Sequence, residues 1–187
     1  MFKKKKSLFS ARSSIAARVV RGLGGFVLMT FSAMPVSAST VFINELHYDN
    51  SGADAGEGVE IAGPAGTDLA GWSLALYDGA SGSLYDSLSL VGLIPDQQNS
   101  YGTMFFPIAG IQNGGTATPD GLALVNNTSV MQFISYEGMF TAVDGPAAGL
   151  ISVDIGVAET GTTPPGFSLQ LAGTGNLYQD FAWNGPA

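Results

Sequence analysis

Oxygen-bearing side chains gather in the segment 49–57, which reads Asp-Asn-Ser-Gly-Ala-Asp-Ala-Gly-Glu. Calcium takes about six to eight oxygen ligands from carboxylates, amides and backbone carbonyls, and a glycine-rich loop can bend around such an ion. The side chains that would supply oxygens are Asp49, Asn50, Asp54 and Glu57. The segment departs from the EF-hand pattern, because its third and fifth positions hold Ser51 and Ala53. We therefore interpret it either as a calcium site or as an acidic surface turn held by Asx hydrogen bonds.

Two further carboxylates, Glu45 and Glu60, stand in apolar stretches that read as strands. Neighbouring strands could bring them together to share a cation, or to share a proton as an acid–base pair. The alternative, which the sequence favours, is that the two side chains face outward or accept backbone hydrogen bonds.

His47 is the only histidine of the chain. A lone imidazole can act as a general base or as one metal ligand. A zinc site rich in histidine and cysteine is excluded, because the chain has no cysteine. The sequence also lacks a Gly-x-Ser-x-Gly elbow and, with one histidine, a catalytic triad. We expect His47 to be a solvent-facing strand residue, and we expect no catalytic residues.

The two tryptophans differ in their expected exposure. Trp72 alternates with Leu74 and Leu76, which predicts a position in the core. Trp183 lies near the end of the chain, and a partly exposed indole among acidic neighbours would suit a carbohydrate better than a nucleic acid base. The partner that the sequence allows is therefore an extracellular protein or a carbohydrate.

Short runs of Val, Ile, Leu, Phe and Tyr, separated by glycine-rich turns, must position these side chains. Such runs predict about eight to ten short strands and an antiparallel β-sandwich. No segment shows a helical period over about three turns. The expected strands cover residues 41–48, 59–62, 72–77, 84–90, 103–106, 122–125, 130–136, 150–153, 167–171 and 178–183.

The basic residues all lie at the start of the chain. All seven Lys and Arg residues fall within the first 21 positions, and an apolar stretch at 22–34 follows them. That stretch is shorter than the ~20 residues of a membrane-spanning helix, and Val36-Ser37-Ala38 then supplies a small-x-small motif. This order predicts a secretory signal peptide over 1–38 and an exported mature domain over 39–187, without membrane insertion after cleavage. The alternative is an uncleaved membrane anchor.

The mature domain would be a polyanion. It would carry 0 − 15 = −15 before its termini and His47 are counted. Nucleic acid binding draws most of its affinity from Lys and Arg, so we expect no direct binding of DNA or RNA. The mutual repulsion of the carboxylates must be relieved by solvent, counterions, hydrogen bonds or divalent cations. A salt-adapted habitat would explain the acidity without a specific site.

A set of ordered motifs runs along residues 41–183. The first three are Ile43-Asn44-Glu45-Leu46, Gly58-Val59-Glu60-Ile61 and Leu69-Ala70-Gly71-Trp72-Ser73-Leu74. The later ones are His47-Tyr48-Asp49-Asn50 with Asp54, Gly56 and Glu57, then Ser135-Tyr136-Glu137-Gly138, Asp144-Gly145-Pro146-Ala147, Asp154-Ile155-Gly156-Val157 and Ser168-Leu169-Gln170-Leu171. Together they resemble the lamin-tail domain family, in the form found near the N-terminus of large secreted bacterial nucleases.

The resemblance implies an immunoglobulin-like β-sandwich and a non-catalytic module, because the chemistry of such nucleases lies in a separate downstream domain. We expect a secreted module with a binding, adhesion or scaffolding role, accessory to an extracellular nuclease where the two are fused. The alternative is a truncated or divergent member of an extracellular metal-dependent endonuclease family that lacks its catalytic domain. A third hypothesis is a matrix or surface-layer protein whose carboxylates gather calcium at many weak sites.

Overall fold

The structure, a computed structural model, describes residues 40–115 and 117–187. Within these ranges the chain forms ten strands and one 3-10 helix: β1 (Phe42–His47), β2 (Gly58–Pro64), β3 (Trp72–Asp78), β4 (Ser83–Ser89), β5 (Tyr101–Pro107), β6 (Asp120–Asn126), β7 (Ser129–Tyr136), β8 (Val153–Asp154), β9 (Leu169–Gly173), η1 (Tyr178–Asp180) and β10 (Phe181–Asn184). The predicted leader at 1–38 lies outside the described residues. In those residues no helix has the length and apolarity needed to cross a membrane.

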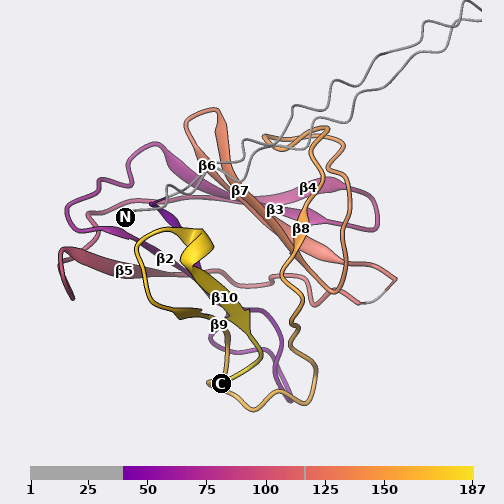
Figure 1. Cartoon of the computed structure of the whole chain (residues 1–187). Coiled ribbons are helices and arrows are strands. Elements are labelled where there is room, and N and C mark those ends of the chain that lie inside the picture. Colours follow the sequence, from indigo (N-terminus) through magenta and orange to yellow (C-terminus); the bar gives the residue numbers. More distant parts are fainter. Residues whose placement is uncertain (1–39, 116) are drawn as a thin grey trace, which may run out of the picture. The chain divides into compact units, whose positions relative to one another are not determined.

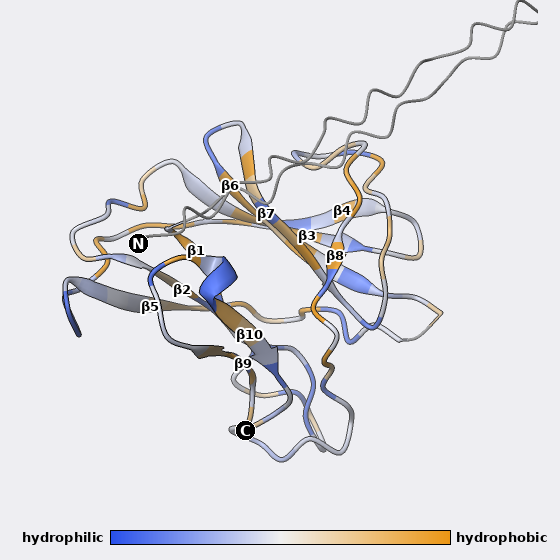
Figure 2. Ribbon diagram, viewed as in Figure 1, coloured by the Kyte–Doolittle hydropathy of each residue, from blue (hydrophilic) through white to orange (hydrophobic). Residues whose placement is uncertain are grey.

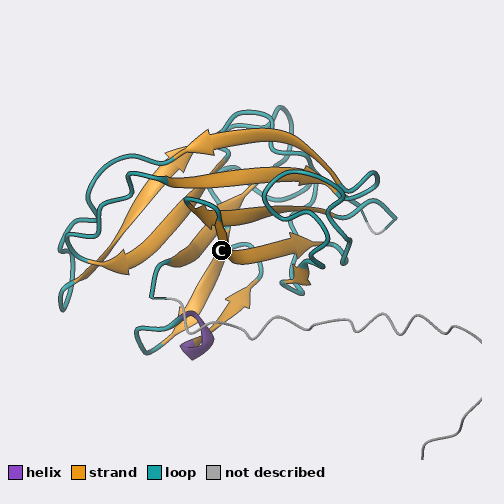
Figure 3. Cartoon of the chain, turned by 90° about the horizontal axis from the view of Figure 1, so that it is seen from above, coloured by secondary structure: helices purple, strands orange, loops and turns teal. Residues whose placement is uncertain are grey.

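The strands form two five-stranded sheets that pack face to face (Figures 1 and 3). One sheet has the order β10-β9-β1-β2-β5, and the other has the order β4-β3-β6-β7-β8. The prediction of an all-β sandwich with about eight to ten short strands is confirmed. One pairing differs from the antiparallel expectation, since β8 runs parallel to β7. The chain makes a long excursion between these two strands and returns in the same direction.

The main core lies between the sheets. Alternation along β3 sends Trp72, Leu74 and Leu76 into this core, as the sequence predicts, and Leu122 and Leu124 join them from β6. In Figure 2 the hydrophobic colour is concentrated along the strands, β6 and β7 among them, while η1 is hydrophilic. The core therefore fixes the strands, and the strands position the loops at their ends.

The other face of the β3–β6–β7 sheet carries a second, smaller core. Ala75, Tyr77 and Ala123 point away from the main core and share a cluster with Phe133 and Phe140. The rings of Phe133 and Phe140 meet edge to face, with centroids 5.4 Å apart, an arrangement that aromatic pairs favour. This cluster fixes the segment 139–150, part of the excursion between β7 and β8, against the sheet.

A β-bulge interrupts β1 between Ile43 and Glu45. Because of this bulge, Ile43 and Leu46 are both fully buried, although strict alternation would put residues three apart on opposite faces. Glu45 and His47 flank Leu46 and lie on the opposite face of the strand. The chain beyond β8 reaches both of them there, through Ser168 at Glu45 and through Glu159 at His47.

Candidate functional site

The predicted calcium loop connects β1 to β2, and Asn50 organises its first half. The Asn50 side-chain oxygen accepts a hydrogen bond from the Ala55 backbone N–H (2.9 Å), and its amide group donates to the carbonyls of Ser51 and Ala53 (3.2 Å each). The Asn50 backbone N–H donates to Asp54 Oδ1 (3.3 Å). These contacts are the Asx hydrogen bonds that the alternative interpretation of the segment requires.

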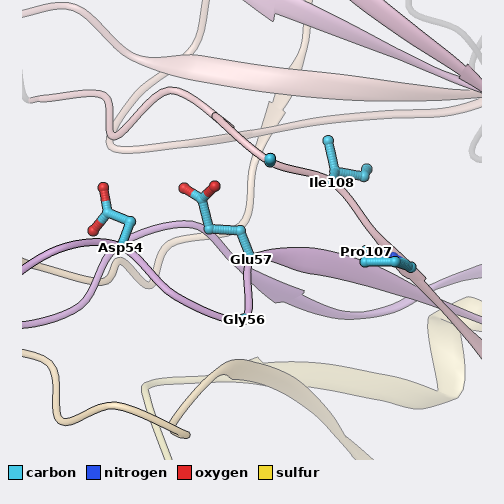
Figure 4. Close-up of a pocket in the computed structure, with 6 residues that line it drawn as sticks. Asp54, Gly56, Glu57, Pro107 and Ile108 are labelled. Atoms are coloured by element: carbon cyan, nitrogen blue, oxygen red, sulfur yellow. The ribbon is translucent and has the colours of Figure 1, made fainter.

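The second half of the loop faces a depression of about 360 Å³ that is lined by Asp54, Glu57, Pro107, Ile108 and their neighbours. Figure 4 shows the carboxylates of Asp54 and Glu57 turned to the same side of the loop, towards the segment that carries Ile108. Glu57 Oε2 accepts the Gly110 backbone N–H (2.5 Å), and Asp54 Oδ2 accepts the Asn113 amide (3.3 Å). Both carboxylates therefore already bind protein donors.

Asp49 differs from the other three predicted calcium ligands. Asp49 is only 9% exposed, and within the described ranges no hydrogen bond reaches its carboxylate. Burial, followed by the charge of Asp54, raises the pKa of Asp49, while the charge of His47 acts in the opposite direction. Among the described residues no three His, Asp or Glu side chains come close enough to hold a metal ion. A calcium ion here would need Asp54 and Glu57 to exchange their present donors, and calcium binding stays a prediction.

His47 is buried, and the expectation of a solvent-facing residue is wrong. The side chain lies on the outer face of β1, as alternation requires, but the chain beyond β8 covers it and leaves the residue 6% exposed. Its Nδ1 lies 2.8 Å from Glu159 Oε1, and its Nε2 lies 3.1 Å from the Ala55 carbonyl and 3.3 Å from Asn50 Oδ1. Both ring nitrogens thus face oxygen acceptors.

This environment favours the protonated imidazolium, because only that form has an N–H on each nitrogen. Burial, the largest influence on His47, lowers its pKa. The hydrogen bond and the charge of Glu159, helped by the Ala55 carbonyl, outweigh burial, so that the pKa of His47 is raised above 6.5. When His47 is protonated, it forms an ion pair with Glu159 in the interior of the protein.

Glu159 has no solvent exposure and accepts three hydrogen bonds. Besides His47, the backbone N–H groups of Tyr48 (2.6 Å) and Asp49 (2.9 Å) donate to Glu159 Oε2. The Glu159 backbone N–H in turn donates to the Tyr48 hydroxyl (2.7 Å). The ring of Tyr48 stacks on that of Tyr136, with centroids 3.9 Å apart. Glu159 thereby ties the chain beyond β8 to the end of β1, and we call this arrangement the Glu159 latch.

Sequence reasoning missed Glu159, because it lies in an irregular stretch 112 positions away from His47. A signal was nevertheless present. The chain after Arg21 has one basic side chain and fifteen carboxylates, and a lone cation that leaves water requires an anionic partner. That argument predicts a partner for His47, but it does not say which of the fifteen carboxylates is chosen.

Glu45 and Glu60 are directly opposite each other in the register of β1 and β2. Glu45 Oε1 accepts the Ser168 hydroxyl (2.5 Å), and Glu60 Oε1 accepts the Asn44 amide (2.7 Å). The strands bring the two carboxylates to neighbouring positions, as the first hypothesis requires. Each, however, binds a different side-chain donor, and both residues are half-buried.

Trp72 is 8% exposed and belongs to the main core, which confirms its predicted position. Trp183 is partly exposed, as predicted, and packs against the same core. Its Nε1 donates to the Tyr178 hydroxyl (3.0 Å). This hydrogen bond holds the indole edge of Trp183 against η1.

A second group of carboxylates, at Asp120, Glu137 and Asp154, was not singled out from the sequence. Asp120 is 4% exposed and accepts the Gly79 backbone N–H (2.9 Å). Glu137 is half-buried, and in the described residues its Oε2 is enclosed without a hydrogen bond. Burial raises the pKa of Glu137 most, and the charges of Asp120 and Asp49 raise it further, while the Tyr48 hydroxyl acts in the opposite direction. This group has no cation beside it in the described part of the chain.

Comparison of the chain with protein-family models, with curated proteins and with solved structures finds no match in any of the three.

Proposed function

We propose that this chain is an extracellular, non-catalytic module of the lamin-tail kind with a binding or scaffolding role. The ordered motifs along 41–183 support the family, and the two-sheet architecture agrees with the sandwich that the family implies. The basic start and the apolar stretch that follows support export. In a protein that also carries a nuclease domain, the module would act as an accessory to it.

The observation that carries the proposal is that His47 is buried and hydrogen-bonded inside the protein. A general base needs a free ring nitrogen within reach of a substrate. The His47 side chain is buried, and both of its nitrogens face oxygen acceptors inside the protein. The only imidazole of the chain is therefore committed to holding the fold, which supports a role in binding over a role in acid–base chemistry.

Hydrolysis of DNA by the full chain, expressed from Met1, tests this proposal against the endonuclease alternative. We expect no cleavage of linear duplex DNA above the buffer blank with Mg²⁺, Mn²⁺ or Ca²⁺ at neutral pH. Cleavage that disappears in the D49N/D54N double variant, but persists in a matched D68N/D96N variant, would overturn the non-catalytic assignment. N-terminal sequencing of the protein recovered from the medium tests export, and the expected first residue is Ser39.

A further inference from the structure

The excursion between β7 and β8 contains a two-stranded ribbon. The segments 139–143 and 149–153 run antiparallel, with Thr141 opposite Ile151. Backbone hydrogen bonds join them from Ala142 N to Leu150 O (3.0 Å), from Gly149 N to Ala142 O (2.7 Å) and from Ser152 N to Phe140 O (2.9 Å). The ribbon is therefore a regular element, although most of it lies outside the named strands.

The outward face of the ribbon is largely apolar, although the domain beyond Arg21 is strongly acidic. Phe140, Ala142 and Ser152 point inward and are buried. The outward side chains alternate with them, and apart from Thr141 they are large, apolar and exposed: Met139 (67%), Val143 (63%), Ile151 (52%) and Val153 (57%). Four of the eight exposed large apolar side chains of the described residues thus share one face, which we call the apolar ribbon face. Exposed apolar side chains that gather on one surface are typical of an interaction site.

The ribbon is anchored to the sandwich. The buried Tyr77 hydroxyl accepts the Ala147 N–H (2.9 Å) and donates to the Asp144 carbonyl (3.3 Å). The Asp144 carboxylate accepts the Leu84 N–H (2.7 Å), and the Val143 N–H donates to the Gly82 carbonyl (2.8 Å). A partner that docks on the apolar ribbon face would meet a surface that is already ordered, so association would lose little conformational entropy on this side.

Charge identifies the kind of partner. The domain beyond Arg21 has no Lys or Arg to set against its fifteen carboxylates. A second copy of the chain would bring the same excess of negative charge to the contact, which disfavours self-association. A segment with basic side chains would have complementary charge.

We propose that the apolar ribbon face, formed by Met139, Val143, Ile151 and Val153, binds an extended polypeptide segment in which aliphatic and basic side chains alternate. The aliphatic side chains of that segment would cover the ribbon, and its Lys or Arg side chains, which an extended chain turns to the opposite side, would lie in the negative field of the domain's fifteen carboxylates. This inference rests on the proposed binding role and names the chemistry of the partner.

Fluorescence anisotropy with defined peptides tests the inference on the full chain. The probe is a labelled nine-residue peptide, Lys-Val-Lys-Val-Lys-Val-Lys-Val-Lys, at about 0.15 M salt, where the Debye length is about 8 Å. We expect this peptide to bind at least tenfold more tightly than two control peptides, one with Ser in place of Val and one with Glu in place of Lys. Equal binding of the Lys–Ser peptide would show that charge alone is responsible and would overturn the inference.

Variants locate the binding. The quadruple variant M139S/V143T/I151T/V153T should bind the Lys–Val peptide at least tenfold more weakly than the unchanged chain. The matched control V91T/L93T alters two side chains that are equally exposed elsewhere, at 68% and 63%, and should bind as the unchanged chain does. Should the quadruple variant lose its thermal unfolding transition, the V143T/I151T pair, with an expected loss of at least threefold, replaces it.

Three further results would overturn the inference: equal binding by the unchanged chain and the variant, an equal loss in the control variant, or a dimer in sedimentation that the ribbon variant abolishes. The last result would assign the face to a second copy. A failure here, with DNA hydrolysis absent, leaves the non-catalytic assignment in place. DNA hydrolysis would overturn that assignment whatever the peptides do.

Discussion

Two glutamates beside the stacked tyrosines Tyr48 and Tyr136 differ in what surrounds their carboxylates. Glu159 is fully buried, pairs with His47 and accepts two backbone N–H groups. Glu137 follows Tyr136 directly, is half-buried, and meets the charges of Asp120 and Asp49. The domain has a single cation for fifteen carboxylates beyond Arg21, and the fold brings that cation to the carboxylate with the least access to water.

The comparison shows that burial alone does not decide whether a carboxylate stabilises a fold. Glu159 leaves water completely, but its lost hydration is replaced by three donors. Glu137 keeps part of its hydration, yet its enclosed Oε2 has no hydrogen bond within the described residues. Its backbone is also left-handed, with φ of 66°, a conformation that costs a non-glycine residue roughly 1 kcal/mol or more. Removal of the two charges should therefore have opposite effects on stability.

The largest effect is expected for Glu159→Gln. This change keeps the shape of the side chain but leaves the His47 imidazolium buried without its anion, and the loss of one partner from a buried pair costs about 3–5 kcal/mol. Urea unfolding of the full chain, followed by tryptophan fluorescence, measures the loss. A loss below about 1 kcal/mol would mean that the latch contributes little to stability.

A double-mutant cycle sharpens that result. In the His47→Asn/Glu159→Gln double variant the unpaired charge is absent, so the summed losses of the two single variants should exceed the loss in the double variant by about 1–3 kcal/mol. Simple additivity of the two losses would contradict a direct interaction between His47 and Glu159.

The next largest expected effect on stability is that of calcium binding at the 49–57 loop. At a hundredfold excess over its dissociation constant, a ligand that binds only the folded state adds about 2.7 kcal/mol. We expect a rise in the unfolding temperature that is specific to Ca²⁺ and absent from D49N/D54N, measured against Mg²⁺, NaCl and chelator, with D68N/D96N as the charge-matched control. An equal, small rise with all three salts would assign the acidity to general charge repulsion and would contradict a calcium site.

The sequence was sufficient for the framework of this domain. Alternation around Trp72 correctly predicts which side chains enter the main core, and the polar turn at 126–129 correctly predicts the hairpin of β6 and β7. Alternation along 84–90 also correctly predicts a strand, in spite of Asp86. Because β4 is an edge strand, Asp86 remains exposed there, and its carboxylate accepts a hydrogen bond from the Ser87 N–H (2.7 Å).

The sequence was not sufficient for the long connection from 137 to 168. Its contacts depend on partners far away in the chain, such as Phe140 on the outer face of the sheet and Glu159 beside His47. Local patterns carry no information on such pairings. The burial of His47 was missed for the same reason, since alternation places it on the outer face of β1 but does not reveal what covers that face.

The pH dependence of the free energy of unfolding should distinguish the His47–Glu159 pair from Glu137. The folded state raises the pKa of His47 above its ordinary value of 6.5. The stabilisation from the imidazolium is therefore complete below about pH 6.5 and is lost as the pH rises through the folded-state value. The pKa of Glu137 is raised from 4.5, so protonation of Glu137 also favours the folded state, and its contribution is lost as the pH rises in a lower window.

We expect the free energy of unfolding to fall in two steps as the pH increases from 4 to 9. Urea titrations at each pH measure both steps. His47→Asn should remove the step above pH 6.5 and leave the lower one, whereas Glu137→Gln should reduce the lower step only. A single step that neither variant alters would show that other carboxylates control the pH dependence.

The smallest predicted effect is the most direct test of the comparison, because its sign is opposite to that of Glu159→Gln. Glu137→Gln removes a charge that is repelled by Asp120 and Asp49 and supplies an amide that can donate to either of them. Relief of a partly solvated repulsion is worth about 0.5 kcal/mol, and we expect the variant to be more stable by about that amount in low salt, with the gain reduced in 1 M NaCl as the repulsion is screened. Glu57→Gln is the matched control, since Glu57 already accepts the Gly110 N–H and should gain nothing. A loss of stability in Glu137→Gln, comparable to that in Glu159→Gln, would show that the Tyr48 hydroxyl stabilises the Glu137 carboxylate more than Asp120 and Asp49 repel it, and that the two glutamates are alike.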